Sequence, residues 1–303
     1  METVACNLCG SAEASELFSS TLPASDESRS EGAFRCTASG YGSHFRIVQC
    51  RQCGLAYASP RYDRAKLLER YRSVKDPLYL EESEGRRLTF RNHLAALERW
   101  TGSGAGRPLL DVGAYTGVFV DVARQAGWQA EGLEPSSWAV DHARACGLPM
   151  IEGTLESAHL PNAAYAVLTM WDVIEHLGDP LHELREAWQV LRPGGYLAVH
   201  TMDRGSLFAR VMGRRWPWLM EMHLYYFSTH TLRAILKEAG FEVLAVQPQG
   251  RYLRLGYLAT RVKPYSRLAA AALDRVAKVL RLRELAVPVN FGDLITAYAR
   301  KPS

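Results

Sequence analysis

The sequence predicts an α/β protein built on a doubly wound, mostly parallel sheet of seven strands, with an N-terminal zinc ribbon and helical insertions. Three observations lead to this prediction. From residue 109 onward, short apolar runs alternate with segments of helical length, which is typical of parallel sheets with crossover helices. The run 164–173 (AYAVLTMWDV) is apolar almost throughout and fits a strand buried on both faces. Two Cys-x-x-Cys pairs lie within the first 60 residues.

Length and composition limit the number of domains and their class. A chain of 303 residues suits one large domain with appendages, and 22% charged residues argue against wholesale disorder. We expect a zinc-ribbon module at 1–60, a helical connector at 61–106 and a main domain at 107–303. No apolar run of 18 residues occurs, and the first residues do not resemble a signal peptide, so we expect a cytoplasmic protein.

The four cysteines of the first module are Cys6, Cys9, Cys50 and Cys53. In a reducing compartment, such pairs bind metal more often than they form disulfides. A glycine follows each pair directly and suits a tight metal-binding knuckle. Four thiolates without a histidine predict a closed, structural zinc site rather than a catalytic one. The module lacks a dense basic cluster with interleaved aromatic residues, so nucleic acid is not an expected partner.

The remaining elements follow from periodicity and capping. Asp63 is a candidate N-cap for a helix that reaches Tyr71, and 78–100 has apolar residues at helical spacing. A glycine-rich loop at 101–108 precedes the main domain. The expected strands of that domain are 109–113, 128–134, 148–153, 164–173, 196–201, 241–247 and 293–301, and the expected helices are 116–125, 136–146, 180–191 and 228–239.

The segment 109–117 (LLDVGAYTG) reads as a strand, a glycine-bearing turn and the start of a helix. In doubly wound sheets, ligands bind beyond the carboxyl ends of the strands, close to free helix N–H groups. Gly113 lets the backbone approach a ligand, and Gly117 lets the helix pack near the strand. Asp111 stands at the entrance of the loop, and Glu134 ends the next strand. This pair of carboxylates suits a ligand with a cationic ammonium and a ribose better than it suits a nucleotide pyrophosphate.

Further motifs then occur in the order and at the spacing of a known family. The sequence resembles class I S-adenosylmethionine (SAM) dependent methyltransferases, in particular the UbiG-like group, over roughly residues 80–250. The matching stretches are 109–117, GLEPS at 132–136, LTMWDVIEHL at 168–177, LRPGGYLAV at 191–199 and the H-x-x-x-F run with its following helix at 223–243.

The resemblance implies a Rossmann-like methyltransferase fold, SAM as the methyl donor and a set of cofactor-binding residues. Asp111 would hold the amino group of SAM, through water, and Glu134 would bind both ribose hydroxyls. The other implied positions are Gly113, Tyr115 and Gly117 in the loop, Pro135 beside Glu134, Thr154, Leu155 and Glu156 near the adenine, and Trp171 and Asp172 near the methyl group.

Tyr115 departs from the family pattern because it replaces the middle glycine of the loop. Tyrosine adopts a positive φ less readily than glycine does. We therefore expect either a displaced loop or a tyrosine that packs against the methionine part of the cofactor.

Histidines are the candidate catalytic residues, since transfer to a hydroxyl requires removal of a proton near neutral pH. His176 follows the fourth expected strand, and His223 lies in an aromatic segment at 204–227 that we interpret as a lid over the acceptor. His200, at the end of the fifth strand, is a third candidate. The alternative for each is a structural hydrogen bond. The aromatic residues that would wall an apolar pocket or pack the lid are Trp216, Trp218, Tyr225 and Tyr226.

A basic helical insertion is expected at 251–290. Residues 251–283 hold nine basic residues and one acidic residue, with leucines at amphipathic spacing. Such a segment can contact an anionic membrane, a carrier protein or a phosphate-bearing substrate. The alternative interpretation is a solvated pair of helices that caps the edge of the sheet.

The predicted function is methyl transfer from SAM to a small-molecule acceptor, at oxygen, in secondary-metabolite or cell-envelope glycan biosynthesis. The alternatives are methylation at carbon or nitrogen, an RNA-modifying methyltransferase that uses the ribbon as a clamp, and a SAM-binding scaffold without catalysis.

Overall fold

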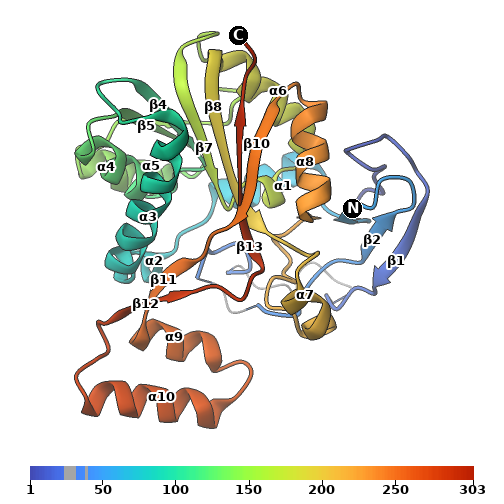
Figure 1. The fold of residues 1–303 in the computed structure, drawn as a ribbon. Coiled ribbons are helices and arrows are strands. Elements are labelled where there is room, and N and C mark those ends of the chain that lie inside the picture. Colours follow the sequence, from blue (N-terminus) through green and yellow to red (C-terminus); the bar gives the residue numbers. More distant parts are fainter. Residues whose placement is uncertain (24–31, 38–39) are drawn as a thin grey trace.

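A seven-stranded sheet forms the centre of the molecule (Figure 1). The computed structural model describes residues 1–23, 32–37 and 40–303. The order across the sheet is β10 (Glu242–Pro248), β13 (Leu294–Arg300), β8 (Leu191–Met202), β7 (Tyr165–Trp171), β4 (Pro108–Val112), β5 (Gln129–Glu134) and β6 (Met150–Glu152). Strand β13 pairs antiparallel with both neighbours, and the other pairs are parallel. The predicted fold class is confirmed.

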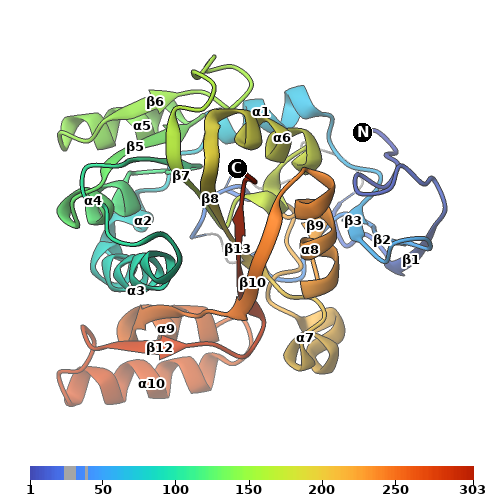
Figure 2. The same ribbon diagram turned by 45° about the horizontal axis from the view of Figure 1, so that its top comes forward.

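Helices cover both faces of this sheet. Helices α3 (Ser83–Thr101) and α4 (Val118–Gln125) lie on one side, and α6 (Pro180–Val190) and α8 (Thr229–Glu238) lie on the other (Figure 2). Helix α5 (Ser137–Ala145) connects β5 to β6. Ser136 caps α5 by accepting a hydrogen bond from the backbone N–H of Ala139, and Ser228 forms a capping box at α8. The local sequence thus specifies where these helices begin.

The connector differs from the single long helix expected at 78–100. Helix α1 (Arg64–Arg72) is capped by Asp63 as predicted, and a short α2 (Pro77–Glu81) then precedes α3. The chain bends at Glu82, which is buried and accepts hydrogen bonds from the backbone N–H and the Nε of Arg254. A distant arginine therefore holds the carboxylate at the point where the helix breaks.

The N-terminal module forms a second sheet, of four strands. Its order is β1 (Ala14–Phe18), β2 (Ile47–Cys50), β3 (Ala56–Ala58) and β9 (Tyr225–Tyr226). All its strand pairs are antiparallel, and β9 comes from the expected lid segment. The sheet of this module therefore includes one strand from a distant part of the chain.

The segment 204–227, interpreted from sequence as a lid, is packed into the fold at both ends, and its role over an acceptor stays a prediction. The segment begins with α7 (Leu207–Met212) and ends as an integral strand of the N-terminal sheet. Trp216 is 2% exposed, and the indole N–H groups of Trp216 and Trp218 both donate to Asp293, at 2.9 Å. Trp216 and Tyr226 pack in one apolar cluster with residues of both sheets, so packing accounts for these two aromatic side chains.

The basic insertion is an arm that projects from one end of the molecule (Figure 1). Strands β11 (Arg251–Arg254) and β12 (Ala286–Val289) form its antiparallel stalk. Helices α9 (Leu255–Val262) and α10 (Arg267–Val279) pack on each other beyond the stalk. Among the described residues, no helix combines the length and apolar character needed to span a bilayer.

Candidate functional site

Two buried carboxylates face the loop between β4 and α4. Asp111 and Glu134 are 3% and 6% exposed, and they come from the adjacent parallel strands β4 and β5. Asp111 accepts a hydrogen bond from the hydroxyl of Thr169 at 2.7 Å. Glu134 accepts from the backbone N–H of Tyr115 at 3.0 Å and from that of Ser136 at 2.9 Å. The carboxylate of Glu134 therefore joins the middle of the predicted ligand loop to the start of α5.

The loop keeps a left-handed backbone at all three family positions. Tyr115 has φ +47°, beside Gly113 at +69° and Gly117 at +76°. A Cβ on Gly113 would lie 2.6 Å from a methyl group of Val173, which explains why this position needs glycine. Tyr115 costs about 1–3 kcal/mol in backbone strain at its position. Tyr115 thus adopts the left-handed conformation itself, in place of the glycine of the family pattern.

The side chain of Tyr115 turns toward the covering helix α2. Its ring contacts that of Tyr79 edge-on, with centroids 4.5 Å apart, and both residues are less than a tenth exposed. The contact with the methionine part of a cofactor remains a prediction.

Burial raises the pKa of both carboxyl groups. The pKa of Asp111 rises to about 8, because the group is desolvated and its hydrogen bond from Thr169 only partly offsets this effect. The pKa of Glu134 rises to about 7, also through desolvation, against the two N–H donors. Asp111 thus keeps its proton at pH 7 until a ligand favours the carboxylate.

Several buried polar atoms around the loop and around the end of β7 lack a hydrogen-bond partner within the described part of the chain. Because unpaired buried polar groups are costly and rare, such a group indicates a missing ligand or water. A carboxylate also has about four lone-pair sites, so each Glu134 oxygen can accept a further donor. These features fit a ligand with ribose hydroxyls and polar ends, as SAM has. The unpartnered atoms are Tyr115 Oη, Thr116 Oγ1, Trp171 Nε1, His93 Nδ1, Gln249 Nε2 and Arg251 Nε.

A pocket of about 310 Å³ adjoins the helical side of the loop. Thr116 and Gly117 line it, together with Tyr79 and Arg87 from the connector and His142 from α5. Asp111 and Glu134 do not line this pocket, so it is separate from the two carboxylates.

A charged cluster lies at the carboxyl end of β7, directly after Trp171. Asp172 has φ +57°, and one of its carboxylate oxygens accepts from His200 Nδ1 and Arg251 Nη2, each at 2.8 Å. Desolvation opposes ionisation of Asp172, but Arg251 and His200 hold its pKa well below the usual range. His200 Nε2 also faces the carbonyl of Gln249, at 3.1 Å. The predicted candidates Asp172 and His200 therefore form one ion-pair cluster.

Sequence reasoning missed His93, which joins this cluster from α3. Its ring lies 4.8 Å from that of Trp171 and 4.9 Å from that of His200, centroid to centroid. Its Nε2 donates to the carbonyl of Gly250 at 3.1 Å. Desolvation and the nearby His200 lower its pKa to about 3, so the ring is neutral. No motif surrounds His93, and only its position on the inner face of α3 was a signal.

The structure brings the two predicted catalytic histidines together, with ring centroids 4.8 Å apart. His176 Nδ1 lies 2.9 Å from the carbonyl of Met222, and His223 Nδ1 lies 2.7 Å from that of Trp218. Desolvation lowers the pKa of both rings, that of His223 to about 3. Sequence reasoning missed Glu175, whose carboxylate belongs to the same group although it directly precedes His176 in the family motif.

The residues expected near adenine contact other groups. Glu156 pairs with Arg64 at 2.6 Å, and Thr154 forms a local turn with Ser157. Leu155 is buried in the main apolar core, and Pro135 is half-buried beside Glu134. Leu155 contributes to the apolar surface at this end of the sheet, and the adenine contacts remain a prediction.

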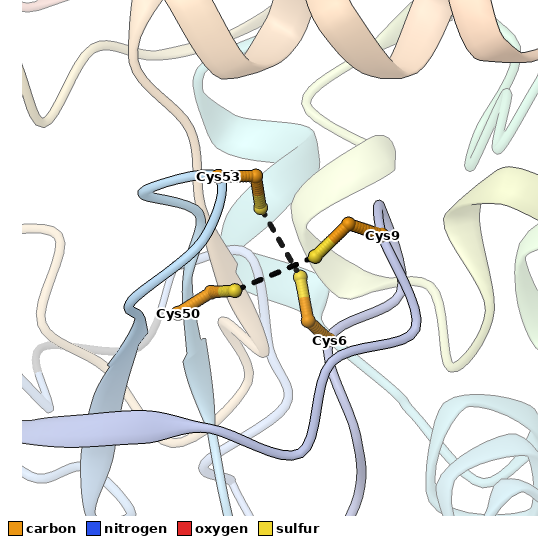
Figure 3. Close-up of side chains that lie close together, drawn as sticks. All are labelled: Cys6, Cys9, Cys50 and Cys53. Carbon is orange, nitrogen blue, oxygen red and sulfur yellow. Dashed lines mark hydrogen bonds between the residues drawn. The ribbon is translucent and has the colours of Figure 1, made fainter.

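The four cysteines of the N-terminal module converge (Figure 3). The Sγ atoms of Cys6 and Cys53 are 3.4 Å apart, those of Cys9 and Cys50 are 3.5 Å apart, and all four lie within 4.8 Å of one another. Zinc–sulfur bonds of about 2.3 Å in a tetrahedron would separate the sulfur atoms by about 3.8 Å. The cluster therefore fits a tetrahedral zinc ion.

Asn7 connects the first knuckle to the main domain. Its amide nitrogen donates to Asp179 at 2.8 Å, and its amide oxygen accepts from the backbone N–H of Leu181 at 2.9 Å. Both partners lie at the start of α6. Two hydrogen bonds therefore join the cysteine module to this helix of the main domain.

Comparison with known proteins agrees with this geometry. A sequence model described as a methyltransferase domain matches residues 82–246, more than half of the chain. A probable S-adenosylmethionine-dependent methyltransferase of Mycolicibacterium smegmatis is 33% identical over 157 residues, 51% of this chain and 59% of that protein. A ubiquinone biosynthesis O-methyltransferase of Vibrio parahaemolyticus is 33% identical over 106 residues, 33% of this chain and 45% of that protein. The chain thus covers less than two thirds of either relative.

Solved structures share the fold. A chain from the complex of the Haloferax volcanii Trm112 methyltransferase activator with a methyltransferase aligns with a TM-score of 0.55 at 17% identity, covering 77% of this chain and 98% of that one. The [4+2]-cyclase SpnF aligns with a TM-score of 0.50 at 22% identity, covering 70% of this chain and 80% of that one. At such identities, the likeness concerns the fold alone.

Proposed function

The chain belongs to the methyltransferase domain family, and on that basis we propose that it transfers a methyl group from SAM to a small-molecule acceptor. The observation that supports this most directly is the pair of buried carboxylates, Asp111 and Glu134, on either side of a left-handed loop. Bound SAM supplies an electrophilic methyl group on a sulfonium. Glu134 would accept the ribose hydroxyls, Asp111 would face the ammonium, and Trp171 would border the methyl side.

We assign the methylated atom to oxygen. An acceptor hydroxyl has to lose its proton, and the neutral rings of His176 and His223 lie beside the Asp172 cluster. The ubiquinone O-methyltransferase relative supports this choice and a place in the UbiG-like group. A secondary metabolite or a cell-envelope glycan precursor is the acceptor class that we propose, and a cytoplasmic location suits the unpaired cysteine thiols.

Calorimetry with S-adenosylhomocysteine, followed by transfer from methyl-labelled SAM to a panel of hydroxyl and amine acceptors, tests the function. We expect binding, and label in hydroxyl compounds only. The absence of heat and of a thermal shift at millimolar ligand would defeat the proposal. Label in an amine or at a carbon atom would show that the assignment to oxygen is wrong. Salt-dependent RNA binding would favour the RNA-modifying alternative.

SAM affinity should rise with pH. Asp111 has a pKa of about 8 in the free protein, and an ammonium partner favours the carboxylate, so binding releases a proton below that pH. The affinity should increase by up to about tenfold per pH unit between pH 6 and 8 and then level off. Calorimetry in buffers of different ionisation enthalpy measures the proton release. Asp111→Asn should bind more weakly and keep only the pH dependence that Glu134, with its pKa of about 7, contributes, whereas an unchanged slope in that variant would contradict the assignment.

We propose that the projecting arm contacts an anionic membrane surface, because α10 leaves an apolar stripe uncovered. Leu268 is 86% exposed, Val276 is 54% and Val279 is 74%, and all three lie on the helix face opposite Ala270 and Ala277, which are buried. The spacing of these side chains gives α10 a second apolar face besides the one that packs on α9. Exposed Arg275 and Lys278 accompany this stripe, which suits anionic lipid headgroups.

Vesicles that contain phosphatidylserine should therefore co-sediment with the protein at low salt, and neutral vesicles should not. Each Arg or Lys near such a surface contributes about 1 kcal/mol, so Arg275→Ser with Lys278→Ser should weaken binding about 30-fold. Leu268→Asp with Val279→Asp should abolish it. The matched control is Leu207→Asp with Val211→Asp, at residues equally exposed on α7. Absence of sedimentation at low salt, or equal loss in the control, would exclude the membrane contact, and a carrier protein would then be the partner to examine.

A further inference from the structure

Glu175, His176 and His223 each offer one ligand atom, and these atoms all lie within 4.8 Å of one another. We propose that these three side chains bind a divalent transition-metal cation, which in turn holds the hydroxyl oxygen of the methyl acceptor. The inference rests on the methyl-transfer function proposed above. It is independent of the four-cysteine cluster, which uses other residues.

The orientation of both imidazole rings is set by backbone carbonyls. His176 Nδ1 faces the carbonyl of Met222 at 2.9 Å and the hydroxyl of Tyr71 at 3.0 Å, and His223 Nδ1 faces the carbonyl of Trp218 at 2.7 Å. Because a carbonyl oxygen only accepts, each Nδ1 carries the hydrogen. The Nε2 atom of each ring is therefore left with a lone pair. No hydrogen bond to either Nε2 occurs within the part of the chain that the structure describes. A carbonyl on the second ring nitrogen is the usual support of a metal-bound histidine.

The carboxylate and the second histidine are also fixed before any ligand arrives. Glu175 is 1% exposed and accepts a hydrogen bond from the hydroxyl of Thr201 at 2.9 Å. The backbone carbonyl of Glu175 accepts from the N–H of Leu224 at 2.8 Å, directly after His223. This bond holds the turn after β7 against the segment that carries the other ligand. Two segments far apart in the sequence thus form one preorganised donor set.

Two histidines and one carboxylate form a ligand set that suits zinc and similar transition metals and leaves positions open. The set lies beside the expected methyl side of the cofactor. The ring of His223 is 6.2 Å from that of Trp218, which stacks under Arg251, and Arg251 pairs with Asp172. An acceptor oxygen in an open position would therefore lie near the charged cluster at the end of β7.

The cation would supply the activation that O-methylation requires. A bound cation lowers the pKa of a coordinated hydroxyl, so its proton leaves to water. The resulting oxyanion forms the new O–CH3 bond with its electron pair while the S–CH3 bond of SAM breaks. The sulfur keeps that electron pair, and the cofactor leaves as neutral S-adenosylhomocysteine. His176 and His223 then act as metal ligands instead of accepting the proton themselves.

Cobalt titration of the full chain, purified with zinc in its cysteine cluster, tests this site. Co²⁺ bound by nitrogen and oxygen should give weak visible bands without the intense near-ultraviolet thiolate band that a cysteine site gives. We expect one equivalent of this kind, in competition with added Zn²⁺. Metal analysis after zinc loading should then find two ions per chain. A single zinc ion, together with no visible cobalt bands, would show that the three residues form only a hydrogen-bonded cluster.

Histidine variants show whether the visible cobalt bands come from this site. His223→Gln and His176→Gln should each abolish the visible cobalt bands, and the exposed His230→Gln on α8 should retain them. Glu175 is too buried to be the principal test, so the two histidine variants decide. Binding of S-adenosylhomocysteine, measured on the same samples, checks folding and separates the two proposals. Cofactor binding without cobalt bands overturns the metal site alone, whereas cobalt bands without cofactor binding overturn the proposed function alone. Bands that persist in both histidine variants would also overturn the assignment.

Discussion

Glu134→Ala should lose binding of S-adenosylhomocysteine by at least about 100-fold. Hydrogen bonds to a charged group contribute about 1.5–3 kcal/mol each, and two ribose hydroxyls would be lost together. The sum of about 3–6 kcal/mol corresponds to a factor of about 10² to 10⁴ in the dissociation constant. Among the described carboxylates, Glu134 alone accepts hydrogen bonds from the backbone N–H groups of both Tyr115 and Ser136. No neighbouring acid is therefore placed to take over its role.

The same substitution also removes the support of the loop. The backbone N–H groups of Tyr115 and Ser136 would lose their acceptor in a buried place, and the left-handed φ of Tyr115 would lose its restraint. Glu134→Gln keeps one carbonyl oxygen as an acceptor and should therefore bind more tightly than the alanine variant but more weakly than the wild type. The order wild type, Gln, Ala in calorimetry is the expected result.

A matched control exists one strand away. Glu152 lies opposite Glu134 in the parallel register of β5 and β6 but is exposed, so Glu152→Ala should bind the cofactor as the wild type does. Circular dichroism and the unfolding temperature show whether each variant is folded. A folded Glu134→Ala protein with wild-type affinity would remove the ribose contact from the proposed site.

The main sheet could be predicted from sequence because each of its signals is local. The loop at Gly113 and Gly117 needs left-handed backbone, and the apolar run around Leu168 is too long for an edge strand. Asp111 and Glu134 could also be predicted, because strand ends that neighbour in a parallel sheet bring their residues to the same edge. Each of these residues therefore lies in or directly beside the sequence motif that predicts it.

The rest of the site depends on contacts between distant segments. The strand Tyr225–Tyr226 consists of two residues and is defined only by pairing with Ala56 and Tyr57. His93 reaches the site because α3 packs beside the stalk of the arm, and Arg251 reaches Asp172 from the stalk itself. A sequence pattern of helical or strand period contains no information on such pairings.

Loss of the metal from the cysteine cluster should unfold more than the first 60 residues. Cys50→Ser removes one thiolate, and structural zinc sites contribute about 10–16 kcal/mol to the folding of their modules. That exceeds or equals the stability of a typical domain, about 5–15 kcal/mol. We therefore expect Cys50→Ser to lose its zinc and the order of the four-stranded sheet.

The damage should reach β9 and the segment before it. Cys6 and Cys50 are each 2% exposed, and they belong to the same apolar core as Met222 and Tyr225. Because β3 pairs with β9, the segment around His223 would lose its anchor, and proteolysis should cut near 204–227 as well as in the first 60 residues. Metal analysis, limited proteolysis and calorimetry on the same sample measure the three effects.

The exposed free thiol Cys146 provides the control, since Cys146→Ser should keep the zinc, the proteolytic pattern and the cofactor affinity of the wild type. The cofactor loop lies on β4 and β5, away from the cysteine sheet, so Cys50→Ser should still bind S-adenosylhomocysteine more strongly than Glu134→Ala does. Methyl transfer to the acceptor should be lost in this variant, because the position of His223 depends on the pairing of β9 with β3. A Cys50→Ser protein that resists proteolysis at 204–227 would show that the methyltransferase domain holds this segment without the metal module.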